Sequence, residues 1–438
     1  MIIRGAKTIH GRVRMPGDKS ISHRAAMIAA LAEGTSSISN FSTSADCAAT
    51  LSCLAALGVG IKRDRNDLAI NGAGLDGLRA APDSLDCRNS GTTMRLLAGI
   101  LAGQDFTSTL TGDESLRSRP MQRIIEPLRM MGVQITSDDG RAPLVIQGHR
   151  GLQAITYELL VASAQVKSCI LLAGLGADGR TEIIENETTR DHTERMLRSF
   201  GVPVEVGPAE REGARFAAVV GPARLAARNL AIPGDVSSAA FFLAAAALVP
   251  GSSLEISDVG VNPTRTLFLK QLRALGLDVE IGDLDADQDE PTGVIRARGS
   301  RPKRSGNSDS PMMISGIIVP QLIDELPLLA VVGSQIQGGI EIRDAAELRV
   351  KESDRIATTA QNLRAMGADV EEFADGFRVA GPVNLRGAKI DPRGDHRIAM
   401  AFSVAGLLAE GETEITDSEC VAVSFPEFFE LLESVVKR

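Results

Sequence analysis

The sequence predicts an α/β protein of two similar domains, each built from three repeated helix-strand-helix-strand units. Along the chain, six short polar segments each open an alanine- and leucine-rich helical run. Behind five of these runs, a second helical stretch ends at an apolar residue followed by glycine, which is a helix C-cap signature. The two halves also stay in register, because Pro16 and Pro233 lie 217 positions apart and so do Gly34 and Gly251.

The polar openings and the glycine stops define the predicted units. The openings are Gly17–Ser20, Asn89–Thr92, Ser163–Lys167, Gly234–Ser238, Asp324–Pro327 and Gly394–Arg397. The stops are Gly58, Gly132, Gly201, Gly276 and Gly367. Since no unit can bury its own apolar face, neighbouring units must pack together. We therefore expect one domain at 16–232 and a second formed by 1–15 with 233–438, with buried helices and outer sheets.

Composition narrows the class of protein. The chain has 438 residues, which is comfortable for two domains, and 44% of them are hydrophobic. A formal charge of −9, a single Tyr and no Trp argue against nucleic acid as a partner. The five cysteines are scattered and odd in number, so neither a disulfide framework nor a zinc site is expected. A reducing cytoplasm is the expected compartment.

Other segments carry structural expectations only. The N-terminus lacks the apolar core of a signal peptide, and the run Ala239–Pro250 is too short to span a bilayer, so no membrane association is expected. The stretch Gly299–Pro311 has no apolar periodicity and is expected to form an exposed, mobile loop. The acidic stretch Asp283–Glu290 is expected to be a solvated hairpin or turn.

The six openings suggest an anion site. A helix N-terminus presents unpaired N–H groups, worth about 0.3–1 kcal/mol to a nearby anion. Cations gather in or near the same places: Lys19, Arg24, Arg95, Arg119, Lys167, Arg190, Lys351, Arg355 and Arg397. In an acidic chain this placement favours a small polyanion bound in a cleft between the domains. Carboxylates among these cations, Asp324, Glu352 and Asp354, are suited to proton transfer.

Purely structural readings stand beside these functional ones. Asp18 and Asp235 fit the role of helix N-caps, and Ser20 and Ser237 fit that of capping hydroxyls. An arginine before a proline, as at Arg119, is typical of a surface residue. Lys167 fits the role of a residue that caps its own helix turn. The segment Glu347–Arg355 has the i,i+4 spacing of a salt-bridged helix face.

Seven motifs in chain order decide between these readings, because together they resemble the 5-enolpyruvylshikimate-3-phosphate synthase family. The motifs are Pro16–Ala25, Asn89–Arg95, Gly112–Met121, Ser163–Gln165, Asp324–Pro327, Glu347–Arg355 and Gly394–Arg397. The resemblance spans the whole chain. It implies the enolpyruvyl transferase fold, in which each domain is an inside-out α/β barrel.

The resemblance also implies the reaction. Phosphoenolpyruvate would transfer its enolpyruvyl group to the 5-hydroxyl of shikimate 3-phosphate, through a tetrahedral intermediate and with loss of phosphate. This is a step toward chorismate and the aromatic amino acids, and it needs no metal and no organic cofactor. The substrates carry two phosphates and two carboxylates, which suits the many cations at the openings.

Residue roles follow from the motif match alone. The implied catalytic residues are Asp324, Glu352 and Lys19. The residues implied to bind shikimate 3-phosphate are Lys19, Ser20, Arg24, Ser163, Gln165, Arg190, Asp324 and Lys351. Those implied to bind phosphoenolpyruvate are Lys19, Gly91, Arg119, Gln165, Arg355 and Arg397, with the backbone near Thr92.

The chain departs from the family pattern in several places. Ser90 and Ala164 stand where many members have alanine and serine, Val423 stands where many have a lysine, and Arg190 replaces a frequent tyrosine. These features resemble the divergent second class of the family, some of whose members tolerate the herbicide glyphosate. Gly91 leaves room for glyphosate, so inhibition competitive with phosphoenolpyruvate is expected.

Two alternatives to this family have to be considered. The sister enzyme that acts on UDP-N-acetylglucosamine usually carries a cysteine in the loop matching Asp113–Pro120, which has none here. The other alternative is a non-catalytic anion-binding relative or an RNA-end-processing protein. The non-catalytic relative would have lost Lys19, Asp324 or Glu352, and the RNA-end-processing protein would need a basic surface with aromatic platforms. A monomeric enzyme is the expectation.

Overall fold

The computed structural model describes residues 1–286, 289–302 and 309–438. The chain divides into two compact units. The middle unit is Gly17–Ile232, and the split unit combines Met1–Pro16 with Pro233–Arg438. Residues 303–308 of the expected exposed loop, and residues 287–288 of the expected acidic hairpin, lie outside the described part of the chain.

The middle unit contains three helix-strand-helix-strand-strand repeats. Its helices are α1 (Lys19–Leu31), α2 (Ala45–Ala56), α3 (Gly91–Ala102), α4 (Glu114–Ser118), α5 (Gln122–Met130), α6 (Ala164–Gly174) and α7 (His192–Ser199). Its strands are β3 (Glu33–Ser39), β4 (Gly60–Asp64), β5 (Asp67–Ala73), β6 (Leu85–Asp86), β7 (Thr107–Thr111), β8 (Gln134–Asp138), β9 (Arg141–Gln147), β10 (Leu152–Gln153), β11 (Thr156–Glu158), β12 (Ala177–Glu185), β13 (Val204–Pro208), β14 (Arg215–Gly221) and β15 (Leu230–Ala231).

The split unit repeats the scheme with a shortened last repeat. Its helices are α8 (Val236–Leu248), α9 (Leu267–Ala274), α10 (Val319–Leu322), α11 (Leu326–Gly333), α12 (Arg355–Ala365), α13 (His396–Leu408) and α14 (Phe428–Val435), with 3-10 turns η1 (Gly316–Ile318), η2 (Ala346–Val350) and η3 (Ser418–Val423). Its strands are β1 (Ile2–Arg4), β2 (Thr8–Arg14), β16 (Ser253–Gly260), β17 (Asp278–Asp285), β18 (Thr292–Arg298), β19 (Met312–Ile314), β20 (Ile340–Ile342), β21 (Val370–Phe373), β22 (Gly376–Val379), β23 (Lys389–Ile390), β24 (Glu412–Ile415) and β25 (Val436–Lys437).

The predicted helix starts and stops are confirmed. Helices α1, α3, α6, α8, α11 and α13 all begin inside the predicted openings. The side chains of Asp18 and Asp235 accept backbone N–H groups of Ile21 and Ser237, so both aspartates are N-caps. The glycine stops all have positive φ, between 84° and 98°, as a C-cap requires: Gly58, Gly132, Gly201, Gly276 and Gly367.

The sheets share one pairing pattern. In most repeats the strand after the buried helix pairs with a parallel strand on one side and an antiparallel hairpin on the other, as in the order β6-β7-β9-β8. The same order recurs in β15-β3-β5-β4, β10-β12-β14-β13, β19-β20-β22-β21 and β2-β16-β18-β17, and β25 extends the last of these beyond β2. In the last repeat, β24 pairs with β23 and takes β1 from the N-terminus as its antiparallel partner.

Two strands are exchanged along the chain. β2 precedes α1 in sequence, yet it pairs in parallel with β16 of the split unit. β15 precedes α8, yet it pairs in parallel with β3 of the middle unit. β2 therefore completes the first sheet of the split unit, although the next helix, α1, belongs to the middle unit. β15 completes the first sheet of the middle unit, although the next helix, α8, belongs to the split unit. This pairing explains why residues 1–16 belong to the split unit.

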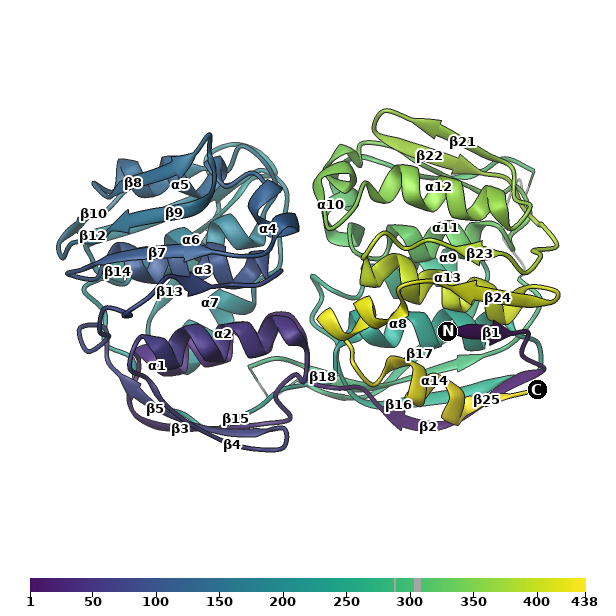
Figure 1. The fold of residues 1–438 in the computed structure, drawn as a ribbon, viewed down its shortest axis with the longest axis horizontal. Coiled ribbons are helices and arrows are strands. Elements are labelled where there is room, and N and C mark those ends of the chain that lie inside the picture. The colour runs from purple at the N-terminus through teal and green to yellow at the C-terminus, as the bar shows by residue number, and fades with distance from the viewer. Residues whose placement is uncertain (287–288, 303–308) are drawn as a thin grey trace. The chain divides into compact units, whose positions relative to one another are not determined.

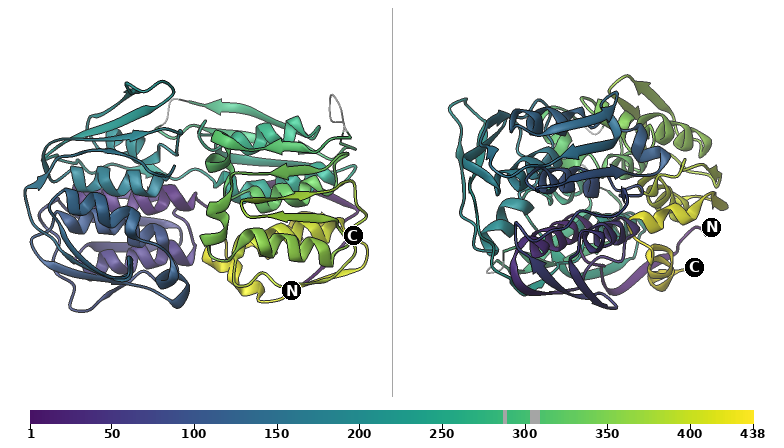
Figure 2. Two further views of the ribbon diagram at one scale, coloured as in Figure 1. Left: turned by 90° about the horizontal axis from the view of Figure 1, so that it is seen from above. Right: turned by 60° about the vertical axis from the view of Figure 1, so that its left-hand side comes forward.

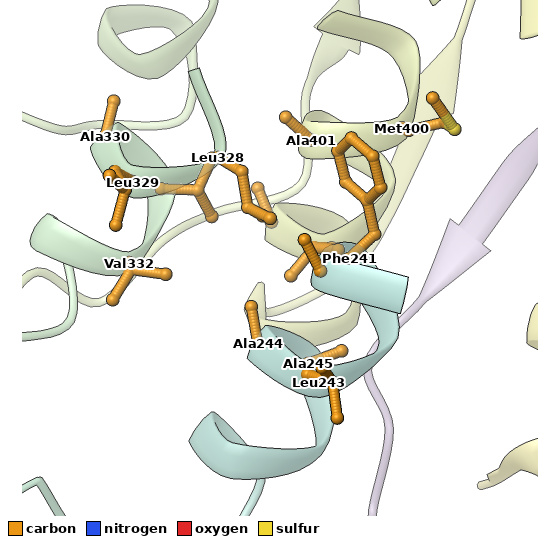
Figure 3. Close-up of a cluster of buried hydrophobic side chains, with 14 of the residues drawn as sticks. Phe241, Leu243, Ala244, Ala245, Leu328, Leu329, Ala330, Val332, Met400 and Ala401 are labelled. Carbon is orange, nitrogen blue, oxygen red and sulfur yellow. The ribbon is translucent and has the colours of Figure 1, made fainter. Parts of the chain in front are cut away.

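Each unit has its own core, formed around its repeat helices. All 13 residues of α8 are buried, as expected for a helix that is apolar on every side. Figure 3 shows Phe241 of α8, Leu328 of α11 and Ala401 of α13 among the side chains of the split unit's core. In this unit β21 and β22 lie outside α12, with α11 beneath it (Figure 1). The predicted arrangement of inner helices and outer sheets is thus confirmed (Figure 2).

The apolar helices in the described part of the chain are short. No single helix there is long and apolar enough to cross a membrane. One pair, Gly316–Leu322 with Leu326–Gly333, reaches the required length and composition only as two pieces bent by 105°. Both pieces are parts of the fold of the split unit.

Candidate active site

Lys19 is the first residue of α1 because Asp18 caps this helix. The Lys19 ammonium lies 2.9 Å from Asp46 Oδ2 in the first turn of α2, and the Lys19 side chain is 17% exposed. Lys19 therefore combines a fixed position with access to solvent. The half-buried Ser20 follows it, and the Ser20 carbonyl accepts a hydrogen bond from Arg24.

Arg24 connects three helices of the middle unit. Its guanidinium donates to Ser20 O at 3.0 Å on α1, Ser168 Oγ at 2.8 Å on α6 and Thr193 Oγ1 at 2.7 Å on α7. The side chain is buried. Arg24 thus fixes the packing of these helices, while its implied contact with shikimate 3-phosphate stays a prediction.

A second cluster lies at the start of α3. Arg119 donates to Asn89 Oδ1 at 2.6 Å and to Ser115 Oγ at 3.2 Å, and Asn89 donates in turn to Asp113 at 2.8 Å. Arg119 is buried, so the reading as an ordinary surface residue is wrong. A Cβ on Gly91 would lie 2.7 Å from Arg95 Nη1 and 3.6 Å from Arg119 Nη1. A side chain at this position would therefore displace the Arg95 guanidinium, whereas its contact with Arg119 would be an ordinary one.

Gln165 joins α6 to α3. It accepts from Arg95 Nη1 at 2.5 Å and donates to Thr92 Oγ1 at 2.9 Å. Ser163 caps α6 by accepting from Val166 N. The structure thus places Gln165 beside Thr92, and the family resemblance implies that both lie near the substrate. Arg95 is a further cation beside Gln165.

Lys167 is not available to a ligand. It is 1% exposed and lies 2.7 Å from Glu194 and 3.1 Å from Glu185. Burial lowers the pKa of Lys167, but the two carboxylates outweigh burial and raise it overall. Glu185 also accepts from the N–H and the hydroxyl of Thr189, which anchors the loop that carries Arg190. The sequence-based grouping of Lys167 with the cations of the anion site is therefore wrong, because Lys167 and both of its partners, Glu185 at 9% and Glu194 at 3% exposure, are enclosed in the unit.

A chain of buried hydroxyls links His23 of α1 to Ser90, the N-cap of α3. His23 Nδ1 contacts Thr50 Oγ1, Thr50 contacts Thr93 Oγ1, and Thr93 donates to Ser90 Oγ, each at 2.7 Å. Burial lowers the pKa of His23 well below its ordinary value, Lys19 and Arg24 add to this shift, and Asp18 opposes it. His23 is therefore neutral and links α1 and α2 to the N-cap of α3.

In the split unit, Arg355 organises three carboxylates. Its guanidinium lies 2.8 Å from Asp395 Oδ2, 2.7 Å from Glu352 Oε2 and 3.4 Å from Asp324 Oδ1. The side chain is 1% exposed. Burial opposes the charge of Arg355, but the surrounding carboxylates outweigh it and raise its pKa. The structure thus brings together Asp324, Glu352 and Arg355, as predicted.

The segment before Arg355 is not a helix face. Residues Ala346–Val350 form the 3-10 turn η2, and α12 begins only at Arg355, capped by Asp354. The i,i+4 pair of Glu347 and Lys351 nevertheless exists, at 3.6 Å. Burial lowers the pKa of Lys351, and Glu347 and Asp324 oppose this shift.

Arg397 lies at the start of α13 and faces the start of α11. Its guanidinium is 3.5 Å from Glu325 Oε1 and 3.9 Å from Asp324 Oδ2. Asp395 caps α13 through the Arg397 N–H while holding Arg355. The sequence analysis missed Glu325 and Asp395 as partners, although Glu325 directly follows Asp324 and Asp395 lies two positions before Arg397. Val423 ends η3, which packs against α13.

These two sets of side chains suit an enzyme that acts on anionic substrates by proton transfer. Cations at helix N-termini recognise phosphate and carboxylate groups, and carboxylates beside them move protons. The fold agrees, since the enolpyruvyl transferase NikO from Streptomyces tendae superposes with a TM-score of 0.78 at 18% identity, over 99% of this chain and 96% of that one. The protein therefore has the enolpyruvyl transferase fold.

Comparisons with known proteins give the family. The model for EPSP synthase (3-phosphoshikimate 1-carboxyvinyltransferase) matches residues 3–432. A 3-phosphoshikimate 1-carboxyvinyltransferase of Geobacter sp. (strain M21) is 48% identical over 100% of this chain and 99% of its own, and one of Koribacter versatilis is 50% identical over the same shares. EPSP synthase from Acinetobacter baumannii superposes with a TM-score of 0.85 at 42% identity, covering 99% of this chain and 97% of that chain.

The chain belongs to the EPSP synthase family. It is a transferase of the shikimate pathway and carries out the 3-phosphoshikimate 1-carboxyvinyltransferase reaction.

Proposed function

We propose that the predicted residues of the two units act together on one pair of substrates, held in a cleft between the units. The observation that supports this most directly is Arg355, which is buried against Asp324, Glu352 and Asp395. In this proposal, the cation that would bind an anionic substrate lies next to the carboxylates of Asp324 and Glu352, which would transfer protons.

Phosphoenolpyruvate would bind to cations from both units. Arg355 and Arg397 of the split unit would join Lys19 and Arg119 of the middle unit, with Gly91 and Gln165 alongside. Neutralising the phosphate and the carboxylate makes C2 more electrophilic and the phosphate a better leaving group. Gly91 supports this assignment, because it leaves the guanidinium groups of Arg95 and Arg119 uncovered by a Cβ.

Shikimate 3-phosphate would bind mainly to the middle unit. Its phosphate and ring would contact Lys19 and the residues of α1, α6 and the loop before α7, namely Ser20, Arg24, Ser163, Gln165 and Arg190. Lys351 and Asp324 of the split unit would bind its hydroxyls. The buried Glu185–Thr189 contacts support a fixed Arg190 loop.

The chemistry would proceed by addition and elimination. Asp324 takes the proton of the 5-hydroxyl while the hydroxyl oxygen attacks C2 of phosphoenolpyruvate. Glu352 or Lys19 delivers a proton to C3. Glu352 or Lys19 then takes a proton from the C3 methyl group of the tetrahedral intermediate, the C2–C3 double bond forms again, the C2–O bond to phosphate breaks, and inorganic phosphate leaves. Acids and bases close together are required for both proton steps.

Phosphate release tests this proposal. Purified protein with phosphoenolpyruvate should release phosphate in the presence of shikimate 3-phosphate and not of UDP-N-acetylglucosamine. Asp324→Asn should lose the activity while still being stabilised by shikimate 3-phosphate. Full activity of Asp324→Asn would remove Asp324 as the base.

Finer properties follow from the same proposal. The enzyme would act as a cytoplasmic monomer, and shikimate 3-phosphate would draw the units together, which small-angle scattering with and without this ligand detects. Glyphosate would compete with phosphoenolpyruvate. Gly91→Ala would weaken the binding of glyphosate because the new Cβ crowds Arg95. A rate unchanged by millimolar glyphosate would contradict this.

A further inference from the structure

A cavity of about 420 Å³ lies at the C-terminal ends of three buried helices of the middle unit. Leu31, Ile100 and Leu172, in the last turns of α1, α3 and α6, line it. Lys19 and Gln165 lie at the opposite ends of α1 and α6, so the cavity has no part in the proposed reaction. Its volume is typical of pockets for small ligands. We propose that the cavity binds a small zwitterion with an apolar body, namely an α-amino acid with an apolar side chain.

The repeats bring six polar side chains to this cavity. In each repeat, one of them follows the buried helix, and another stands three positions after the last strand of the antiparallel hairpin. Those after the helices are Glu33, Gln104 and Asp178, and those after the hairpins are Asp76, Arg150 and Arg224. Carboxyl, amide and guanidinium groups distant in the chain therefore gather at one place because the unit is built from repeats.

Gln104 is a buried polar side chain in the cavity wall. It is 5% exposed, and its Nε2 donates to the carbonyl oxygens of Leu75 at 3.0 Å and Ile100 at 3.4 Å. These two contacts fix the amide, whereas its Oε1 accepts no hydrogen bond from the described residues. Because Gln104 lines the cavity, an ammonium group bound there would supply the donor that Oε1 lacks.

The surroundings of Gln104 also favour an ammonium group. The C-terminal ends of α1, α3 and α6 meet at the cavity, and a helix C-terminus carries partial negative charge. Glu33 and Asp178 add carboxyl groups at the exposed rim, and neither forms an ion pair with the described residues. Three independent features of the wall thus suit a cationic group: an amide oxygen, helix ends and carboxyl oxygens.

Arg224 provides a site for the opposite charge. It is exposed at the same rim and forms no ion pair with the described residues, whereas Arg150 lies 3.6 Å from Asp76. A guanidinium group recognises a carboxylate through paired hydrogen bonds. Leu31 and Leu225, which are 1% and 2% exposed, add an apolar surface. An ammonium, a carboxylate and an apolar side chain are the three parts of an apolar α-amino acid.

Two glycines in the wall show that the cavity borders well-packed helices. A Cβ on Gly99 would lie 2.1 Å from Cys169 O, so α3 and α6 are in close contact there. Gly103 differs, because its φ is −88° and its Cβ would lie 3.8 Å from Leu152 Cδ1, which is an ordinary contact. A larger residue at Gly103 therefore fits the backbone and would occupy part of the cavity.

Calorimetric titration of the whole protein tests the proposal with three probes. L-Phenylalanine has all three parts, phenethylamine lacks the carboxylate, and hydrocinnamate lacks the ammonium group. We expect L-phenylalanine to bind about tenfold more tightly than either analogue, because each analogue loses charge-assisted hydrogen bonds. No binding of L-phenylalanine at millimolar concentrations, or equally tight binding of an analogue, would overturn the inference.

Variants locate the ligand. Gly103→Leu should abolish the binding of L-phenylalanine by filling the cavity. Arg224→Gln should weaken L-phenylalanine about tenfold and leave phenethylamine unchanged, since only the carboxylate contact is lost. Arg215→Gln, which removes an exposed arginine of the same unit outside the cavity, is the matched control and should change neither probe. All three variants should keep the wild-type rate of phosphate release, which shows that the unit remains folded.

Two results with these variants would contradict the assignment. Unchanged binding of L-phenylalanine in Gly103→Leu would place the ligand outside the cavity. Equal weakening of both probes in Arg224→Gln would remove the guanidinium as the partner of the carboxylate, and with it the zwitterion. Arg224→Gln changes an exposed side chain, so it keeps the test decisive if Gly103→Leu is poorly folded.

Discussion

The two units treat the cations near their buried helices differently. In the middle unit, Arg95 and Arg119 are bonded to the neutral side chains of Gln165, Asn89 and Ser115. In the split unit, Arg355 and Arg397 face the carboxylates that start α11 and α13 or lie near them. A carboxylate compensates the charge of the guanidinium beside it, and the guanidinium in turn favours the charged form of the carboxylate, whereas an amide or hydroxyl partner adds a hydrogen bond without charge. The same repeat thus places carboxylates beside Arg355 and Arg397 and amide and hydroxyl groups beside Arg95 and Arg119.

The duplicated helix starts show how this difference arose at single positions. With an offset of 217, Asp18 corresponds to Asp235 and Ser20 to Ser237, but Lys19 corresponds to Val236. In the middle unit the cation is on the buried helix and its acid, Asp46, is on α2. In the split unit the acid, Asp235, caps the helix and its cation, Arg265, precedes α9. Both units therefore keep the capping aspartate. The cation of the ion pair lies on the buried helix in the middle unit, and the acid lies at the start of that helix in the split unit.

Arg355→Met should produce the largest effect, because it breaks the charge compensation of the split unit. Three carboxylates would lose a buried partner, so we expect a loss of about 3–5 kcal/mol in the free energy of unfolding and loss of activity. Chemical denaturation and phosphate release measure both. Arg364→Met, on the same helix but bonded to the carbonyl of Val370, is the control and should remain active. An Arg355→Met enzyme of wild-type stability would mean that the carboxylates are compensated elsewhere.

Asp46→Asn tests the carboxylate partner of Lys19 in the middle unit. Lys19 would lose the charge that orients it, so kcat/KM should fall about 10- to 100-fold. The free energy of unfolding should change by about 1 kcal/mol or less, since the pair is partly exposed. Asp86→Asn, which removes an exposed carboxylate that accepts from Arg88 N, should leave activity unchanged. Equal rates for wild type and Asp46→Asn would show that Lys19 does not depend on Asp46.

Thr50→Val tests the neutral hydroxyl chain of the middle unit. It leaves His23 Nδ1 and Thr93 Oγ1 without their shared partner, and we expect a loss of about 1–2 kcal/mol in unfolding free energy. Thr181→Val is the matched control, because Thr181 Oγ1 is buried with no hydrogen-bond partner among the described residues. The two variants should differ in denaturation midpoint. The same midpoint for both would deny the chain any stabilising role.

Lys351 should give the smallest effect, visible only in the pH dependence. Because burial lowers its pKa, Lys351 loses its charge at a lower pH than an ordinary lysine, whose pKa is about 10.4. The KM for shikimate 3-phosphate should therefore rise as pH rises through that lowered pKa. Lys351→Arg keeps the charge, so the rise should move to higher pH with little change near neutrality. Superimposable KM profiles for the two enzymes would exclude Lys351 as the titrating group.

Much of the site was predictable because its residues stand at helix starts. Lys19, Gly91, Gln165, Asp324 and Arg397 lie in openings where the polar-to-apolar change is visible in the sequence. The partners were not predictable in the same way. Asp46 lies 27 residues from Lys19, and Arg265 lies 28 from Ser237, so only packing brings them together.

The sequence by itself determined the repeats, the six buried helix starts, the glycine stops and the family. These features depend on local signals, namely capping side chains, apolar runs and left-handed glycines, which act within a few residues. Tertiary structure alone decided the exchange of β2 and β15, the burial of Lys167 between Glu185 and Glu194, and the placement of Glu325 against Arg397. Strand pairing and ion pairing join residues that are distant in the chain, and their strength depends on burial, which no local pattern specifies.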